Sequence, residues 1–153
     1  MSDHRLSSYH VAFDSMEPAI AAGTDVLGDT AHYANNKPAR WEVVAFSMGN
    51  NPNRFVKRIL GLPGETIQFT HKGFMIDGSL VPVPAELSGR FSSFSNDHDH
   101  KHGAHPFKVP ADCVFLVGDN PHLYVTDSRE LGPVPIKNLE ARILASIQVT
   151  PIS

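Results

Sequence analysis

Proline and glycine interrupt this chain so regularly that no long helix is expected. The 153 residues include 12 prolines and 11 glycines, spread over the whole length. Between them lie short apolar runs rich in β-branched and aromatic residues, which is typical of β-strands. The runs are VVAF at 43–46, FVKRILGL at 55–62, TIQF at 66–69, FMI at 74–76 and CVFLVG at 113–118. Since no long segment has a 3.6-residue periodicity, the sequence predicts a mostly β fold.

Two further segments refine this prediction. IDGS at 76–79 predicts a tight hairpin turn, because Asp-Gly suits the positive φ angles of such a turn. PIKNLEARILASI at 135–147 predicts one helical turn that leads into a last strand. The expected architecture is therefore a series of short strands with long irregular connections.

Length and composition indicate a single domain over residues 1–153. The hydrophobic fraction is 41% and the charged fraction is 19%, which exclude wholesale disorder. The net charge of −3 provides no basic excess for phosphates, so nucleic acid is not expected as a partner. Cys113 is the only cysteine and is expected to be buried. No apolar run approaches the roughly 18 residues of a membrane helix, so the chain as given is expected to be soluble.

The region 77–108 is expected to be an inserted cap. Its part 89–105, GRFSSFSNDHDHKHGAH, is polar and is expected to be exposed. Its candidate metal ligands are His98, His100, His102 and His105. The first three are two residues apart, so in an extended chain they lie on one face, where their imidazoles could bind Zn²⁺, Ni²⁺ or Cu²⁺. The alternative is a solvated polar loop without a specific metal.

Two segments contain a candidate nucleophile and a candidate base. FDSMEPAI at 13–20 predicts a stiff turn, because Pro18 fixes its own φ and restricts the residue before it. Such a turn could present the hydroxyl of Ser15, which needs a base to act as a nucleophile. Lys57 lies in an apolar strand, where desolvation could lower the pKa of its amine and make it that base. The alternatives are a turn serine bonded to nearby backbone and an edge-strand lysine in solvent.

A third segment, GDNPHLYVTDSRELG at 118–132, completes a pattern with the first two. In this order the segments resemble the type I signal peptidases, membrane-associated serine proteases that remove signal peptides from exported proteins. SMEP resembles the serine box of the family, VKRILGLPGE its lysine box, and the third segment its late box. WEVVAF at 41–46 stands where the family has a Gly-Asp-Val-Val-like strand. The resemblance covers about residues 13–132 and implies a coiled, mostly antiparallel β-sheet fold of the signal peptidase and SOS-repressor protease type, with a small inserted cap.

The resemblance also implies roles for individual residues. Ser15 would be the nucleophile and one oxyanion donor through its backbone N–H, with Lys57 as its general base. Asp127 and Arg129 would form a buried salt bridge that supports the site. The other supporting residues expected are Asp14, Gly118, Asn120, Thr126 and Ser128, and the expected substrate contacts are Phe13, Met16 and Pro18. No cofactor is expected.

Trp41 and Glu42 replace the Gly-Asp of the family strand, and two further positions near the expected catalytic residues depart from the family pattern. Phe13 stands where many bacterial members carry a serine that completes the oxyanion hole, and where other members have glycine. Val125 stands where a family serine steadies the lysine amine, and the neighbouring Thr126 could replace it. Both departures bear on catalytic efficiency.

Three functions are open at this stage. The first is a serine endopeptidase with a Ser-Lys dyad, which cleaves signal peptides or a dedicated precursor after small residues. It would bind its partner as an extended strand, and it could contact the membrane peripherally on the export side. The second is a catalytically impaired peptide-binding module on the same fold, and the third is a metal-handling protein that uses the histidines. The SOS-repressor family shares the serine box and a serine–lysine pair, but its members lack the late box.

Overall fold

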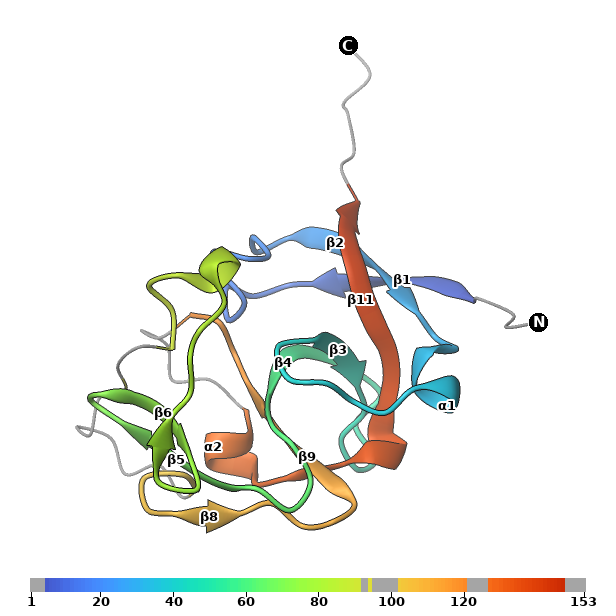
Figure 1. The fold of residues 1–153 in the computed structure, drawn as a ribbon. Helices are drawn as coiled ribbons and strands as arrows, with labels where there is room; N and C mark the ends of the chain where they lie inside the picture. The colour runs from blue at the N-terminus through green and yellow to red at the C-terminus, as the bar shows by residue number, and fades with distance from the viewer. Residues whose placement is uncertain (1–4, 92–93, 95–101, 121–126, 148–153) are drawn as a thin grey trace.

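The fold, known from a computed structural model, consists of two antiparallel sheets (Figure 1). The structure describes residues 5–91, 94, 102–120 and 127–147. The larger sheet has the strand order β1-β2-β11-β3-β4-β9-β10, and the smaller one β7-β6-β5-β8. The strands of the larger sheet are β1 (Leu6–Val11), β2 (Thr24–Asp29), β3 (Val43–Phe46), β4 (Phe55–Gly61), β9 (Cys113–Val117), β10 (Val134–Pro135) and β11 (Leu139–Ile147). Those of the smaller sheet are β5 (Thr66–Thr70), β6 (Gly73–Ile76), β7 (Ser79–Leu80) and β8 (Phe107–Lys108).

The helices of the described residues are short. They are the α-helices α1 (His32–Asn35) and α2 (Ser128–Leu131) and the 3₁₀ turns η1 (Ala85–Leu87) and η2 (Ile136–Asn138). Within the described ranges, no helix has the length and the apolar character that crossing a bilayer requires.

The strands predicted from the apolar runs are confirmed as β3, β4, β5, β6 and β9. The hairpin turn between β6 and β7 has positive φ angles of 50° at Asp77 and 85° at Gly78, as the Asp-Gly pair predicts. The predicted helical turn before the last strand is η2, and β11 follows it directly. The mostly β, antiparallel fold class is thus confirmed.

The larger sheet curls so strongly that its first and fifth strands share one core. Val11 of β1 and Val56 of β4 lie in the same buried cluster, although three strands separate β1 from β4 in the sheet order. Figure 1 shows β1 and β2 at the top of the view, with β3 and β4 below them. Neighbouring residues of β3 alternate between this cluster, which holds Ala45, and a second one on the other face, which holds Val44. The curl brings the end of β1 toward β4.

A third core cluster lies where the smaller sheet meets β4 and β9. It includes Phe91 and Phe94, each only 5% exposed, together with Leu87 of η1. The expectation that 89–105 is exposed is therefore wrong for these aromatic rings, because they fill the apolar space beside Phe69. Within 77–108 the structure describes β7, η1 and β8, and these bounds for a cap remain a prediction.

The apolar runs did not predict the first two strands. β1 has the sequence LSSYHV, and only its last residue is buried. As the end strand of the larger sheet it pairs with β2 alone and covers little of the core, so it carries no run of apolar residues.

Candidate active site

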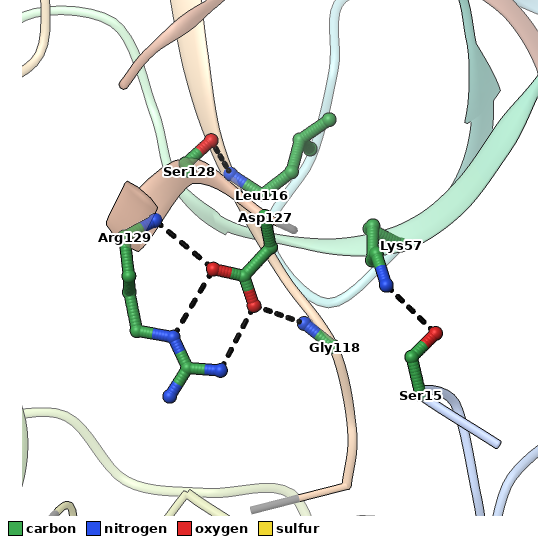
Figure 2. Close-up of polar contacts among 7 residues, drawn as sticks. All are labelled: Ser15, Lys57, Leu116, Gly118, Asp127, Ser128 and Arg129. Atoms are coloured by element: carbon green, nitrogen blue, oxygen red, sulfur yellow. Dashed lines mark hydrogen bonds and ion pairs between the residues drawn. The ribbon is translucent and has the colours of Figure 1, made fainter. Parts of the chain in front are cut away.

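Ser15 and Lys57 meet across 42 residues of sequence. Lys57 Nζ lies 2.7 Å from Ser15 Oγ and donates a hydrogen bond to it (Figure 2). Both residues are buried, with 8% of Ser15 and 5% of Lys57 exposed. The distance is within the reach needed for direct proton transfer between a nucleophile and its base.

The turn that carries Ser15 is held by the loop that follows β9. Asn120 donates through its side-chain amide to the carbonyl of Asp14 and through its backbone N–H to the carbonyl of Ser15. Gly118 lies so close that an added Cβ would stand 2.7 Å from the carbonyl oxygen of Ser15 and 3.6 Å from Lys57 Nζ. Only glycine leaves room for this approach, so both late-box residues support the serine turn directly.

Lys57 is the third residue of β4, and burial of its amine penalises the charged form. Burial lowers the pKa of Lys57 below its ordinary value. The carboxylates of Asp127 and Asp119 act in the opposite direction, whereas the guanidinium of Arg129 adds to the lowering. Desolvation is the largest of these effects, so the pKa of Lys57 is lowered overall.

Asp127 joins the start of α2 to the loop behind the lysine (Figure 2). Its carboxylate accepts hydrogen bonds from the backbone N–H of Gly118 and from the backbone and guanidinium of Arg129, at 2.9 to 3.1 Å. The next residue, Ser128, accepts through Oγ from the backbone N–H of Leu116 at 2.9 Å. Asp127, Ser128 and Arg129 are all buried, so the salt bridge expected in the late box is present and fixes α2 against β9.

A groove of about 790 Å³ runs between β1 and the start of β4. Ser15 and Lys57 lie among its lining residues, and so do Phe13 and Asp14. β1 uses one edge to pair with β2, and β4 pairs with β9 only from Arg58 onward. Among the strands that the structure describes, none pairs with the other edge of β1 or with 55–57 on the β9 side, and the groove lies between these two edges.

Comparison with known proteins identifies the family. Residues 4–147 match the sequence model of the family described as signal peptidase, peptidase S26. The chain belongs to the signal peptidase family. It is 31% identical over 135 residues to signal peptidase I V of Bacillus subtilis (strain 168), which covers 86% of this chain and 79% of the relative. It is 28% identical over 144 residues to signal peptidase I of Bacillus caldolyticus, in an alignment that covers 90% of this chain and 76% of that relative.

A solved structure agrees with this assignment. The crystal structure of a signal peptidase I from Enterococcus faecalis V583 superposes with a TM-score of 0.55 at 26% identity, covering 71% of this chain and 98% of that one. Signal peptidases are serine endopeptidases that cleave signal peptides, so family membership places this chain among the serine peptidases.

The residues predicted to contact the substrate differ in their exposure. Phe13 is 79% exposed at the groove, and Pro18 also lies at the surface. Met16 is completely buried in the core cluster of Val11 and Val56. It therefore packs behind the groove and does not line it. Thr126 lies outside the described residues.

The histidine stretch is described only in part, since His98 and His100 lie outside the described residues. His102 donates its backbone N–H to the carbonyl of Arg129 and packs its ring on Phe107, whereas His105 is exposed. In the described parts of the chain, no three His, Cys, Asp or Glu side chains come together as metal ligands would.

One ion pair of the site was missed. Arg58 follows Lys57 in β4 and donates through Nε and Nη2 to both oxygens of Asp119, each at 2.8 Å. Arg58 was not among the predicted site residues, and it is buried like every residue of β4 after the first. A buried guanidinium needs a carboxylate. The acidic residue of the Gly-Asp-Asn sequence, next to the predicted Gly118 and Asn120, was the available signal.

Replacing Asp127 by asparagine should lower the free energy of unfolding by about 3 kcal/mol, because a buried guanidinium would lose its counter-charge. Urea denaturation followed by circular dichroism measures this change. Asp25→Asn is the matched control, since Asp25 pairs with His10 at the surface, and it should cost less than about 0.5 kcal/mol. Similar small losses in both variants would contradict a structural role for the Asp127–Arg129 salt bridge.

Proposed function

We propose that this chain is a serine endopeptidase with a Ser15–Lys57 dyad, which cleaves signal peptides or a dedicated precursor after small residues. The observation that carries the proposal is the 2.7 Å contact between a buried hydroxyl and a buried amine whose pKa is lowered by desolvation. Family membership supports the reaction class. Burial of an amine costs free energy, and a base held beside a nucleophile gives this arrangement a chemical use.

The reaction would proceed through an acyl-enzyme. Lys57, when neutral, accepts the hydroxyl proton while Ser15 Oγ attacks the carbonyl carbon of the scissile bond. The backbone N–H of Ser15 stabilises the oxyanion that forms. The protonated amine then gives its proton to the leaving nitrogen as the C–N bond breaks. A water molecule, deprotonated by the same amine, hydrolyses the ester and restores both side chains.

The substrate would bind as an extended strand in the groove. The edge of β1 away from β2 and the edge of 55–57 away from β3, which no described strand occupies, would offer backbone groups on both sides of such a strand. Main-chain hydrogen bonds would supply affinity, and the side chains along the groove would supply selectivity. The precursor is therefore recognised mainly by an extended, accessible segment. Peripheral contact with a membrane on the export side stays a prediction.

Cleavage should require a small residue immediately before the cut. Val11, Met16 and Val56 already pack against one another beside the dyad, so a bulky side chain there would have to displace them. For a peptide with an Ala-x-Ala site, replacing the last alanine by phenylalanine should lower kcat/KM about 100-fold or more. Mass spectrometry of the products identifies the bond that is cut, and chromatography gives the rate.

The control peptide carries the same phenylalanine three residues after the cut, and it should be cleaved at nearly the original rate. Two outcomes contradict the proposal. The protein could fail to cleave the Ala-x-Ala peptide, or it could cleave both phenylalanine peptides equally well.

A further inference from the structure

Asp119, the buried carboxylate that pairs with Arg58, has a second arginine partner. This arginine lies outside the three segments that predicted the site. Arg90 follows η1 and donates through Nη1 to Asp119 Oδ2 at 2.9 Å. Arg58 donates to the same oxygen at 2.8 Å. Asp119 is 1% exposed, so a single buried carboxylate holds two guanidiniums.

The backbone around Arg90 is fixed by the core. Leu87 and Phe91, on either side of it in the sequence, are both buried in the third core cluster, where the smaller sheet meets β4 and β9. Phe91 packs on Trp41 with ring centroids 5.7 Å apart, and the carbonyl of Trp41 accepts a hydrogen bond from Arg58 Nη1. Arg90 is therefore anchored on both sides, and its guanidinium is held at Asp119.

Two ion-pair groups lie behind Lys57. One group is Asp119 with Arg58 and Arg90, and the other is Asp127 with Arg129. Asp119 already has Arg58 as a counter-charge, so Arg90 gives this carboxylate a second positive partner. Asp119 lies in the loop after β9, Asp127 and Arg129 lie at the start of α2, and Arg58 is next to Lys57 in β4. Asp119 is one of the carboxylates that raise the pKa of Lys57, so a guanidinium that offsets the charge of Asp119 disfavours the protonated amine.

We propose that Arg90 is a positioning residue that acts through Asp119 to keep the Lys57 amine neutral. The inference rests on the proposed function, in which Lys57 is the base. It assigns a role in catalysis to a residue of the segment that follows η1, and so couples this segment electrostatically to the dyad.

The test compares pH profiles of kcat/KM for the Ala-x-Ala peptide. With Arg90→Gln, the acidic limb should move to higher pH, because Asp119 is then less neutralised and favours the protonated amine. At a pH on the wild-type limb, kcat/KM should fall about threefold, and the two profiles should converge at the plateau. Arg90→Lys keeps the charge and should leave the limb near its wild-type position.

Arg40→Gln is the matched control. Arg40 is about as buried as Arg90 and also forms an ion pair, but its partner is Glu65, away from the dyad. Its profile should keep the wild-type limb. A profile for Arg90→Gln that is lower at every pH without a shift would overturn the proposal, and so would an equal shift in Arg40→Gln.

A direct titration separates this inference from the proposed function. The ¹³Cε signal of Lys57, assigned by its loss in Lys57→Met, reports protonation of the amine whether or not the protein cleaves peptides. A higher titration midpoint in Arg90→Gln supports the role of Arg90 even if no cleavage is found. An unchanged midpoint alongside normal wild-type cleavage refutes the role of Arg90 and leaves the peptidase proposal intact.

Discussion

Replacing Ser15 by alanine should lower kcat/KM for an Ala-x-Ala peptide by about four orders of magnitude or more, because the covalent route is lost. The fold should be retained, since Ser15 is a small residue at the wall of the groove and alanine fills nearly the same volume. Peptide binding should also persist, because the strand edges of the groove are untouched. Steady-state cleavage and fluorescence anisotropy with a labelled peptide measure the two effects separately.

Ser7→Ala is the matched control for this substitution. Ser7 is exposed on β1, and its replacement should leave cleavage unchanged. Full activity in Ser15→Ala would remove the nucleophile from the proposal. If the wild-type protein binds the peptide but cleaves it no faster than Ser15→Ala does, then the chain is the impaired binding module that the sequence also allowed.

The strands that carry the site were predictable where they are apolar. β4 and β9 are buried on both faces, so their composition alone marks them as strands. β1, which forms one wall of the groove, was not predictable in this way, because an edge strand that faces solvent has no apolar pattern. Sequence could therefore predict the lysine side of the groove better than the serine side.

The contacts of the site depend on the curl of the larger sheet, which no local pattern specifies. Ser15 and Lys57 became a candidate pair through their chemistry and the family resemblance, whereas the 2.7 Å between them is a result of the fold. Arg90 illustrates the opposite case. It lies in a polar stretch with no motif, and only the packing of Leu87 and Phe91 brings its guanidinium to Asp119.

Replacing Lys57 by methionine should abolish cleavage and yet stabilise the fold. Activity should fall about as far as in Ser15→Ala, and the double variant should be no worse than either single one, because the two residues act as a unit. Stability should rise by about 1 kcal/mol at neutral pH, because methionine fills the apolar site without the cost of burying an amine. Steady-state cleavage measures the first effect, and thermal unfolding near pH 7 measures the second.

The pH dependence of stability gives this prediction its sign. The pKa of Lys57 is lower in the folded protein than in the unfolded chain, so between the two values the unfolded state binds more protons. As the pH falls from the unfolded pKa to the folded pKa, the wild-type protein therefore loses stability. It regains this stability as the pH rises over the same range. Lys57→Met lacks this dependence, so its advantage over the wild type should shrink as the pH increases.

Lys108→Met is the control, because Lys108 is exposed on β8 and its replacement should change neither activity nor the slope of stability with pH. A structural lysine, held charged by the nearby carboxylates, would give the opposite result. Its removal would lower the melting temperature, and the wild-type protein would be the more stable one at neutral pH. The sign of one stability difference thus distinguishes a base that is kept neutral in the fold from a cation that the fold uses as a counter-ion.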